Sequence, residues 1–185
     1  MKTMENLKFP VGQFIKPETI SESEIKNWIS KIESFPNRLQ TLVNSLSKEQ
    51  LNWVYRPNGW TIKQVVHHCA DSHMNSFIRF KLAITEEFPE IKPYEEQLWA
   101  ELSDGICDDI SPSISIIKGV HKRWVLLLNT FTSTELQKGF YHPGSQKIIL
   151  LDEAIRLYAW HANHHLAHIA QALKFKNNFN TYIYE

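Results

Sequence analysis

Apolar residues recur at intervals of three and four through four long stretches of the chain. This spacing places them on one face of an α-helix, so the pattern predicts four amphipathic helices that share a core. Glycine and proline fall mostly between these stretches, as is typical of connecting loops. The stretches run from Ile25 to Leu46, from about Ile62 to Thr85, from Ser111 to about Thr130, and from about Asp152 to Lys174.

Two of the helix starts carry a capping signal. Ser21 is followed three residues later by Glu24, and Thr61 is followed in the same way by Gln64. In such a capping box, each side chain bonds a backbone N–H group that the first helical turn leaves free. Pro36 lies inside the first stretch, where its ring and its missing N–H should bend or restart the helix.

The segments between the four stretches predict smaller elements. Residues 1–20 contain two prolines and a glycine, which indicates an extended N-terminal arm. A short amphipathic piece is expected near Leu98-Trp99, and the run from Phe140 to Ile149 fits a small hairpin. Residues 1–185 are therefore expected to form a single all-α domain, a four-helix bundle with short extra helices.

The composition excludes several classes of protein. Lys and Arg number 20 and Asp and Glu number 20, whereas a nucleic-acid-binding protein usually carries a basic surplus. The aliphatic runs are too short to cross a bilayer, and the first residues lack the apolar core of a signal peptide. Cys69 and Cys107 are the two cysteines, too few for a disulfide framework, so a reduced, cytoplasmic setting is expected.

Histidine is the residue that points to chemistry, because seven of the nine histidines fall in two short segments. The last helix contains two pairs at a spacing of four, His161 with His165 and His164 with His168. Two imidazoles at this spacing lie on one helix face and can hold one metal ion. His161 and His165 lie at the edge of the apolar stripe, whereas the other pair lies further round, toward the outside of the bundle. We therefore favour His161 and His165 as metal ligands.

A third ligand has to come from another helix, and the second helix offers three histidines. His73 falls in the middle of the apolar stripe, where a hydrogen-bonded core histidine is as good an interpretation as a direct role. His68 lies at the head of a polar stripe, whereas His67 lies on another side of the helix. The spacing favours His68 over His67 only weakly.

The polar stripe after His68 comprises Ser72, Asn75 and Arg79. Small polar side chains on a helix rich in apolar residues suit the wall of a substrate pocket, so these three are candidate substrate-binding residues. Arg79 could bind a substrate carboxylate through two hydrogen bonds, although a surface salt bridge with an acidic neighbour is the slightly favoured interpretation. His142, in the predicted hairpin, could support a substrate or lie at the surface.

Two segments carry a family resemblance, GWTIKQVVHHCADSHMN at 59–75 and YAWHANHHLAHI at 158–169. They resemble the DinB superfamily of metalloproteins, and most closely its YfiT-like branch of metal-dependent hydrolases. The segments FYHP at 140–143 and PVG at 10–12 also resemble this branch, so the similarity covers nearly the whole chain. The resemblance implies an up-down-down-up four-helix bundle and, commonly, a homodimer.

The resemblance also implies which histidines bind the metal. In the superfamily, the first ligand lies eight residues after the Trp that opens the second helix, which corresponds to His68 after Trp60. The other two form a His-x-x-x-His pair on the last helix, here His161 and His165. Ala162 stands where a zinc protease of the His-Glu-x-x-His type has its general base, so the base is not predicted by this motif.

Three neutral imidazoles leave a divalent ion with its full charge and an open position, as in catalytic zinc sites. Zn²⁺ is the expected metal, and Ni²⁺, Fe²⁺ and Mn²⁺ also suit imidazole ligands. Three functions fit this arrangement: hydrolysis of a small electrophilic substrate, transfer of a low-molecular-weight thiol such as bacillithiol, and non-catalytic metal binding in a stress protein. The last would require a fourth protein ligand, and Cys69 points about 100° away from its neighbour His68.

Overall fold

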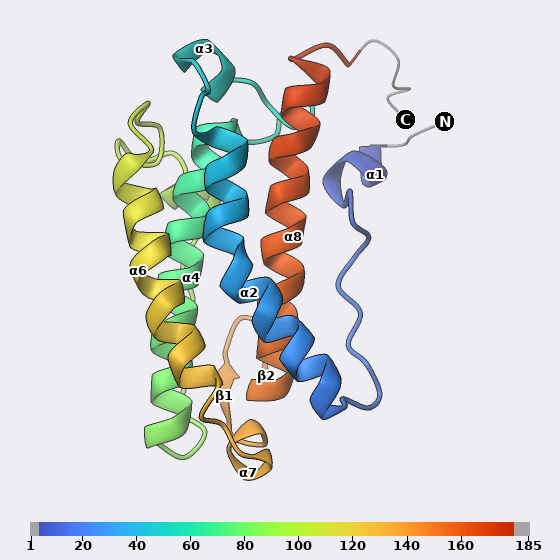
Figure 1. The fold of residues 1–185 in the computed structure, drawn as a ribbon, viewed down its shortest axis with the longest axis vertical. Coiled ribbons are helices and arrows are strands. Elements are labelled where there is room, and N and C mark those ends of the chain that lie inside the picture. Colours follow the sequence, from blue (N-terminus) through green and yellow to red (C-terminus); the bar gives the residue numbers. More distant parts are fainter. Residues whose placement is uncertain (1–3, 180–185) are drawn as a thin grey trace.

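The computed structural model describes residues 4–179 and contains four long helices. Figure 1 shows α2 and α8 running upward and α4 and α6 running downward, which confirms the up-down-down-up bundle expected from the sequence. The long helices are α2 (Glu22–Val43), α4 (Ile62–Thr85), α6 (Ser111–Leu128) and α8 (Leu151–Phe175).

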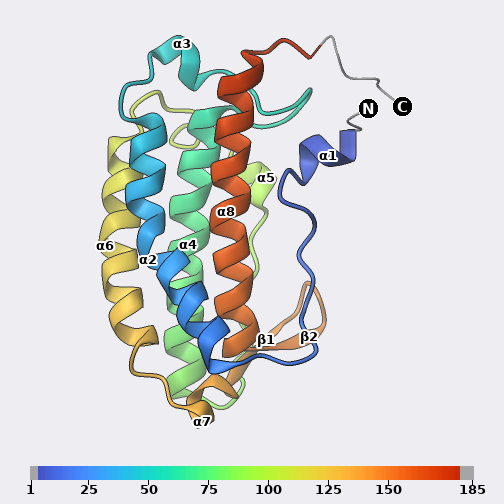
Figure 2. The ribbon, with the colours of Figure 1, turned by 45° about the vertical axis from the view of Figure 1, so that its right-hand side comes forward.

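The long helices pack as a closed ring of four neighbouring pairs, α2 with α8, α8 with α4, α4 with α6, and α6 with α2. Two of these pairs, α2–α8 and α4–α6, are parallel, so each helix has one parallel and one antiparallel neighbour (Figures 1 and 2). In consequence, the second and last long helices lie side by side and run in opposite directions along the core.

Shorter elements precede the first long helix or connect the long helices to one another. The hairpin expected near Phe140 is present, with Gly139 paired to Leu150 and His142 paired to Lys147. These elements are α1 (Met4–Lys8), α3 (Lys48–Leu51), α5 (Glu96–Trp99), α7 (Ser133–Leu136), β1 (Gly139–His142) and β2 (Lys147–Leu150).

The N-terminal arm differs from the expectation in one respect. Residues 1–20 were expected to be extended, but Met4–Lys8 form the short helix α1. This helix forms because Leu7 is buried against the bundle, with only 1% of its surface exposed. Beyond Pro10, the arm has no regular secondary structure up to the start of α2 and runs along the bundle (Figure 2).

The predicted helix starts are confirmed. Ser21 with Glu24 and Thr61 with Gln64 form complete capping boxes at the starts of α2 and α4. Pro36 does not restart α2, which continues through it to Val43. The axis of α2 changes direction near its middle (Figure 1), the bend that an internal proline causes.

The core consists of two apolar clusters, one toward each end of the bundle. One contains residues such as Ile32, Phe80 and Ile155, and the other contains residues such as Phe35, Val66 and Ile169. Between them, on the same inward faces, lie buried imidazoles from α4, α6 and α8. The core is therefore divided by a polar layer near the middle of the bundle.

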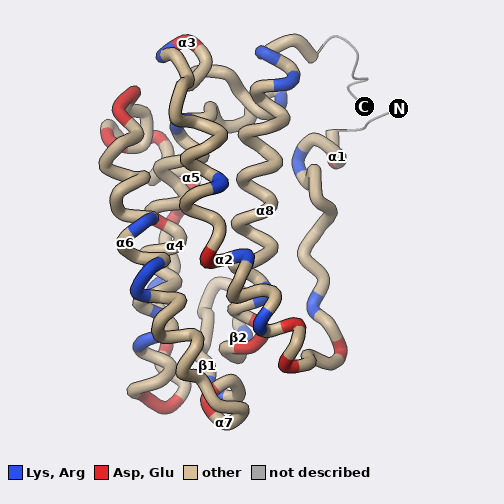
Figure 3. Tube along the Cα trace, in the orientation of Figure 1, with Lys and Arg blue, Asp and Glu red and all other residues tan. Residues whose placement is uncertain are grey.

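Charged residues lie outside this core. Figure 3 shows basic and acidic positions interspersed along the chain trace, in agreement with the balanced charge of the sequence. Within residues 4–179, no helix is both long enough and apolar enough to cross a membrane.

Candidate metal centre

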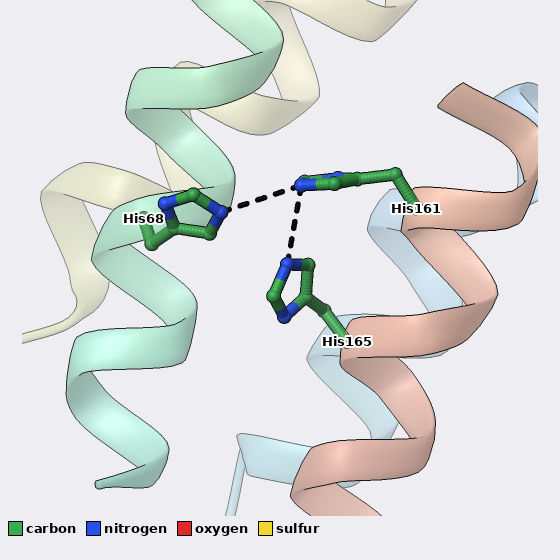
Figure 4. A group of neighbouring side chains, drawn as sticks. All are labelled: His68, His161 and His165. Atoms are coloured by element: carbon green, nitrogen blue, oxygen red, sulfur yellow. Dashed lines mark hydrogen bonds between the residues drawn. The ribbon is translucent and has the colours of Figure 1, made fainter. Parts of the chain in front are cut away.

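Three histidines from α4 and α8 direct their Nε2 atoms toward one another. The Nε2 atoms of His68 and His161 lie 3.3 Å apart, and those of His165 and His161 lie 3.1 Å apart (Figure 4). One ring nitrogen from each lies within 4.8 Å of the other two. In the part of the chain that the structure describes, these three residues form the group of potential ligands that could hold one metal ion.

Local structure explains why these side chains converge. His161 and His165 occupy successive turns of α8 and so lie on one face of it. His68 lies in the second turn of α4, whose first turn is fixed by the Thr61 cap. Because α4 and α8 are neighbours, the two helices present their imidazoles to the same space.

The spacing of the nitrogen atoms fits a metal ion. With Zn–N distances of 2.0–2.1 Å, two ligands of a tetrahedral ion lie about 3.3 Å apart. The observed separations of 3.3 and 3.1 Å are close to this value. A single proton shared between two of these nitrogen atoms would leave the third without a donor, whereas a cation accepts all three lone pairs. The donor set is therefore suited to a divalent ion.

Burial keeps these rings neutral at pH 7. Burial lowers the pKa of His68 to about 4, and the nearby His164 adds to the shift. Burial likewise holds the pKa of His161 and of His165 well below the usual range, and the neighbouring histidines lower both further. A neutral imidazole carries a free lone pair, and this is the form that binds metals.

Two more histidines lie behind His161 in the core. His73 Nε2 lies 3.0 Å from His161 Nδ1, and His73 Nδ1 lies 2.7 Å from His121 Nε2. His121 Nδ1 in turn lies 2.7 Å from the carbonyl oxygen of Ile32. The sequence left the role of His73 open, and the structure shows it as a buried, hydrogen-bonded histidine in contact with the candidate ligand His161.

His121 is the site residue that sequence reasoning missed. It lies outside the two histidine-rich segments, on α6. The signal that could have found it is its place between Ile117 and Trp124, two residues of the apolar face of the same helix. A histidine in the middle of an apolar helical stripe has to find a buried partner.

The other pair on α8 is placed differently from the expectation. His164 and His168 are buried, with 7% and 2% of their surfaces exposed, so the prediction that they face the outside of the bundle was wrong. The N-terminal arm covers this side of α8, and His168 Nε2 lies 3.0 Å from the carbonyl oxygen of Lys8. His168 Nδ1 lies 3.4 Å from His165 Nδ1, and His164 stacks on Trp160.

His67 points away from the cluster, toward α6. Its Nδ1 lies 2.7 Å from the hydroxyl of Ser113, and its Nε2 lies 3.0 Å from the carbonyl oxygen of Cys107. One ring nitrogen therefore contacts α6 itself and the other contacts the connection before it. The structure brings His68, and not His67, to the histidines of α8.

The predicted polar stripe on α4 leads from the cluster toward a cavity. Ser72 is buried, with its hydroxyl 3.4 Å from the Tyr158 hydroxyl. Asn75 lines a cavity of about 610 Å³ whose walls also include Tyr94, Leu98 and Trp99. The Asn75 amide donates to the carbonyl of Asp71, one turn earlier.

Arg79 and His142 make hydrogen bonds with groups other than the three histidines. Arg79 donates to the carbonyl oxygen of Lys92 at 3.4 Å, and its charge partly offsets the burial that raises the pKa of the Glu96 carboxyl. His142 ends β1, and the backbone N–H of Ser145 donates to its Nδ1. Partial burial and the charge of Arg79 lower the pKa of His142.

Cys69 is separated from the cluster, as its position after His68 predicted. It is fully buried within the apolar cluster that contains Val66 and Ala162. Burial raises the pKa of its thiol, which keeps it protonated and unsuited to metal binding.

The fold and the three histidines define a four-helix bundle with a candidate metal centre between α4 and α8. The chain belongs to the DinB superfamily, whose model matches residues 31–169. It is 46% identical over 169 residues to the protein of Bacillus subtilis (strain 168) named "Putative metal-dependent hydrolase YfiT", covering 91% of this chain and 95% of that protein. A Bacillus mycoides (strain KBAB4) relative with the same functional name is 49% identical over 166 residues, covering 90% of this chain and 95% of its own.

A solved structure agrees with these sequence relationships. YfiT from Bacillus subtilis, described as "a probable metal-dependent hydrolase with an unusual four-helix bundle topology", superimposes with a TM-score of 0.89 at 45% sequence identity. The match covers 92% of this chain and 98% of that chain. The fold and the family expected from the sequence are therefore confirmed.

Proposed function

We propose that this protein is a metal-dependent hydrolase in which His68, His161 and His165 hold one divalent ion next to a small electrophilic substrate. The observation that carries the proposal is the convergence of three neutral imidazoles, with His161 Nε2 lying 3.3 Å from His68 Nε2 and 3.1 Å from His165 Nε2. The functional names of the similar Bacillus proteins support the same class of activity.

Zn²⁺ is the metal that we propose first, because three imidazoles with an open fourth position are typical of catalytic zinc. Ni²⁺, Fe²⁺ and Mn²⁺ remain alternatives with the same ligands. When bound, such an ion supplies a positive charge that lowers the pKa of a coordinated water to about 7. Because the three ligands are neutral, they leave that charge undiminished.

Residues next to the cluster shape the space in which a substrate would lie. Ser72 follows His68 by one turn of α4, and Tyr158 precedes His161 by one turn of α8. Their hydroxyl groups lie 3.4 Å apart, so both can meet one polar group of a substrate. The ring of Trp60 lies 4.7 Å from that of His68 and provides an apolar wall.

We further propose that the substrate reaches the cluster from the cavity beside Asn75. Its volume of about 610 Å³ lies within the range of small-molecule sites, and apolar side chains such as Leu98 and Trp99 line it. Lys92 also lines this cavity, and Arg79 is hydrogen-bonded to its carbonyl. Glu95 lines the same cavity, so its walls carry charges of both signs.

Metal analysis of the purified protein, combined with a substrate panel, tests this proposal. We expect one divalent ion per chain and metal-dependent hydrolysis of small chromogenic esters or amides, which a chelator abolishes and added Zn²⁺ restores. The same panel with a low-molecular-weight thiol separates the alternative: conjugate formed only in the presence of thiol would assign a transferase. A protein that binds no metal would contradict both.

The homodimer implied by the family resemblance also stays a proposal. Light scattering on the purified full-length chain tests it directly, with a mass near twice the monomer mass of 21.7 kDa expected. A mass that remains at the monomer value over a wide concentration range would contradict it.

A further inference from the structure

The buried histidines behind the candidate ligands form a continuous hydrogen-bonded series that crosses all four long helices. It runs from His161 on α8 to His73 on α4, then to His121 on α6, and ends at the carbonyl of Ile32 on α2. The successive separations are 3.0, 2.7 and 2.7 Å, all within hydrogen-bonding range. The rings of His73 and His121 are only 1% and 2% exposed, so water does not compete for these contacts.

The carbonyl at the end of the series sets its direction. A carbonyl oxygen can only accept, so Nδ1 of His121 must carry the proton and Nε2 of His121 must accept. Nδ1 of His73 is then the donor to His121, which leaves Nε2 of His73 as an acceptor. Nδ1–H of His161 donates to that acceptor. As a result, Nε2 of His161 carries a free lone pair, and this atom faces His68 and His165.

Pro36 explains why the Ile32 carbonyl is available. In an α-helix, the carbonyl of residue 32 accepts from the N–H of residue 36. Pro36 lies inside α2 and has no N–H, so this bond cannot form. The carbonyl freed by the proline is the one that lies 2.7 Å from His121 Nδ1. The hydrogen bond that Pro36 removes from α2 therefore leaves the acceptor at the end of the histidine series free.

A shorter series leads to His165. Nε2 of His168 lies 3.0 Å from the Lys8 carbonyl and must donate to it, so Nδ1 of His168 is an acceptor. Nδ1 of His165 lies 3.4 Å from that acceptor and can donate to it. The free lone pair of His165 is then again on Nε2, the atom that faces His161. Two separate series, each ending on a backbone carbonyl, therefore lead to the same result.

We propose that His73, His121 and His168 are positioning residues that fix the tautomer and the ring orientation of His161 and His165, with Pro36 freeing the carbonyl that directs the longer series. The inference rests on the proposed metal site and specifies how the chain prepares that site before an ion binds. Partners of this kind behind metal-binding histidines are worth about 10- to 100-fold in metal affinity.

Nitrogen-15 NMR of the histidine rings in the metal-free, full-length protein tests the tautomers without any substitution. We expect His73, His121, His161 and His165 in the Nδ1–H form and His168 in the Nε2–H form. His73 or His121 in the Nε2–H form would overturn the longer series, and His168 in the Nδ1–H form would overturn the shorter one. Because no metal is present, this result stands apart from the success or failure of the proposed function.

Zinc affinity, measured by competition with a chelator, tests the consequence. His73→Phe keeps a ring but removes the acceptor, and we expect a 10- to 100-fold loss of affinity with the helical circular dichroism unchanged. His73→Gln, whose amide oxygen can accept from His161, should recover most of the loss. Pro36→Ala, which restores a competing N–H for the Ile32 carbonyl, should give a smaller loss.

The matched control is His67→Gln, which alters a buried histidine of the same helix whose ring bonds lie outside both series. We expect its zinc affinity to equal that of the unsubstituted protein. Equal affinities for His73→Phe and the unsubstituted protein would overturn the inference. An equal loss in His73→Phe and His73→Gln would do so too, because a packing role alone would then explain both.

Discussion

At the scale of single residues, the role of each histidine depends on the group that each of its ring nitrogens contacts. His67 meets a hydroxyl and a carbonyl, and both of its nitrogens are used in packing two segments together. His161 meets an imidazole at Nδ1 and other imidazoles at Nε2, so it joins the core to the candidate metal centre. Burial depth does not separate these roles, since rings of both kinds are buried.

The choice of ligand pair leads to the first prediction. His161→Ala should reduce bound metal from one ion per chain to a small fraction, because two ligands then remain. His164→Phe should retain the metal, since His164 stacks on Trp160 and its Nδ1 has no hydrogen-bond partner within residues 4–179. Elemental analysis of the purified variants measures both, and metal lost from His164→Phe but kept by His161→Ala would reverse the assignment.

A second prediction concerns acid stability and follows from His121. Burial lowers the pKa of His121 in the folded protein to about 4, against 6.5 for an exposed histidine. Between these values, the unfolded chain binds a proton that the folded chain does not, so the stability contribution is complete above pH 6.5 and is lost as the pH falls toward 4. This contribution amounts to at most about 3 kcal/mol.

Urea unfolding of the metal-free protein at several pH values between 7 and 4 measures this effect. The free energy of unfolding should decrease on acidification, and other buried histidines such as His168, whose pKa is lowered to about 3, act in the same direction. His121→Phe should make the dependence shallower. A free energy that is constant or rises on acidification would contradict the prediction.

At the scale of elements, helix starts were predictable because their signals are local. Ser21 with Glu24 and Thr61 with Gln64 form their capping boxes within four residues of sequence, and the structure confirms both. Spacing also placed His161 and His165 on one face of α8, but it did not predict that the neighbouring His164 and His168 are buried. The five-residue helix α1 was not, because its stability comes from the burial of Leu7 against distant residues.

The partners across the core could not be predicted in the same way. Spacing places His73 on the apolar face of α4, but nothing in the sequence indicates which residue of α6 stands opposite it. His121 contacts both His73 and the carbonyl of Ile32. This depends on how far α2, α4 and α6 are shifted relative to one another along the bundle axis. Pro36 was predicted to bend or restart the helix. That the Ile32 carbonyl it frees accepts from His121 could not be predicted, because this contact depends on the packing of α6 against α2.

The third prediction concerns the cap of α4. Thr61→Ala removes the side chain that accepts from the Gln64 N–H and should lower the free energy of unfolding by about 1 kcal/mol. Because His68 lies in the second turn after this cap, fraying should also weaken zinc binding. Thr61→Ser keeps the hydroxyl and is the matched control. Unchanged stability of the alanine variant in urea unfolding would contradict the prediction.

At the scale of the whole molecule, the N-terminal arm closes one side of the candidate centre. Lys8 and Leu7 provide backbone carbonyls to His168 and Gln171 on α8, and Leu7 is buried beneath them. Beyond this short helix, the arm has no regular structure up to α2 but stays in contact with α8, because the Trp160 indole donates to the Gly12 carbonyl and Lys16 pairs with Glu153. The side of α8 that carries His164 and His168 is buried in consequence.

The fourth prediction tests that attachment. Leu7→Ala should release α1 and increase the rate of proteolysis within α1 several-fold, because core Leu→Ala changes cost about 2–5 kcal/mol. Gly12 and Lys16 should keep the rest of the arm on α8. Ile15→Ala is the control, since Ile15 is 72% exposed. Limited proteolysis followed by mass spectrometry locates the cleavage, and equal rates for the two variants would contradict the docking role.

The parallel orientation of α4 and α6 has a consequence for how such a protein can acquire new substrates. A 24-residue helix is about 36 Å long, so the chain leaving α4 must travel back over that distance before α6 can begin. On this return, Gln97 accepts from the indole of Trp60, whose ring lies 4.7 Å from that of His68, and the carbonyl of Ala100 accepts from Gln64. In the proposed hydrolase, the residues of this crossover can therefore change, and substrate selectivity with them, while the four long helices keep the three histidines in place.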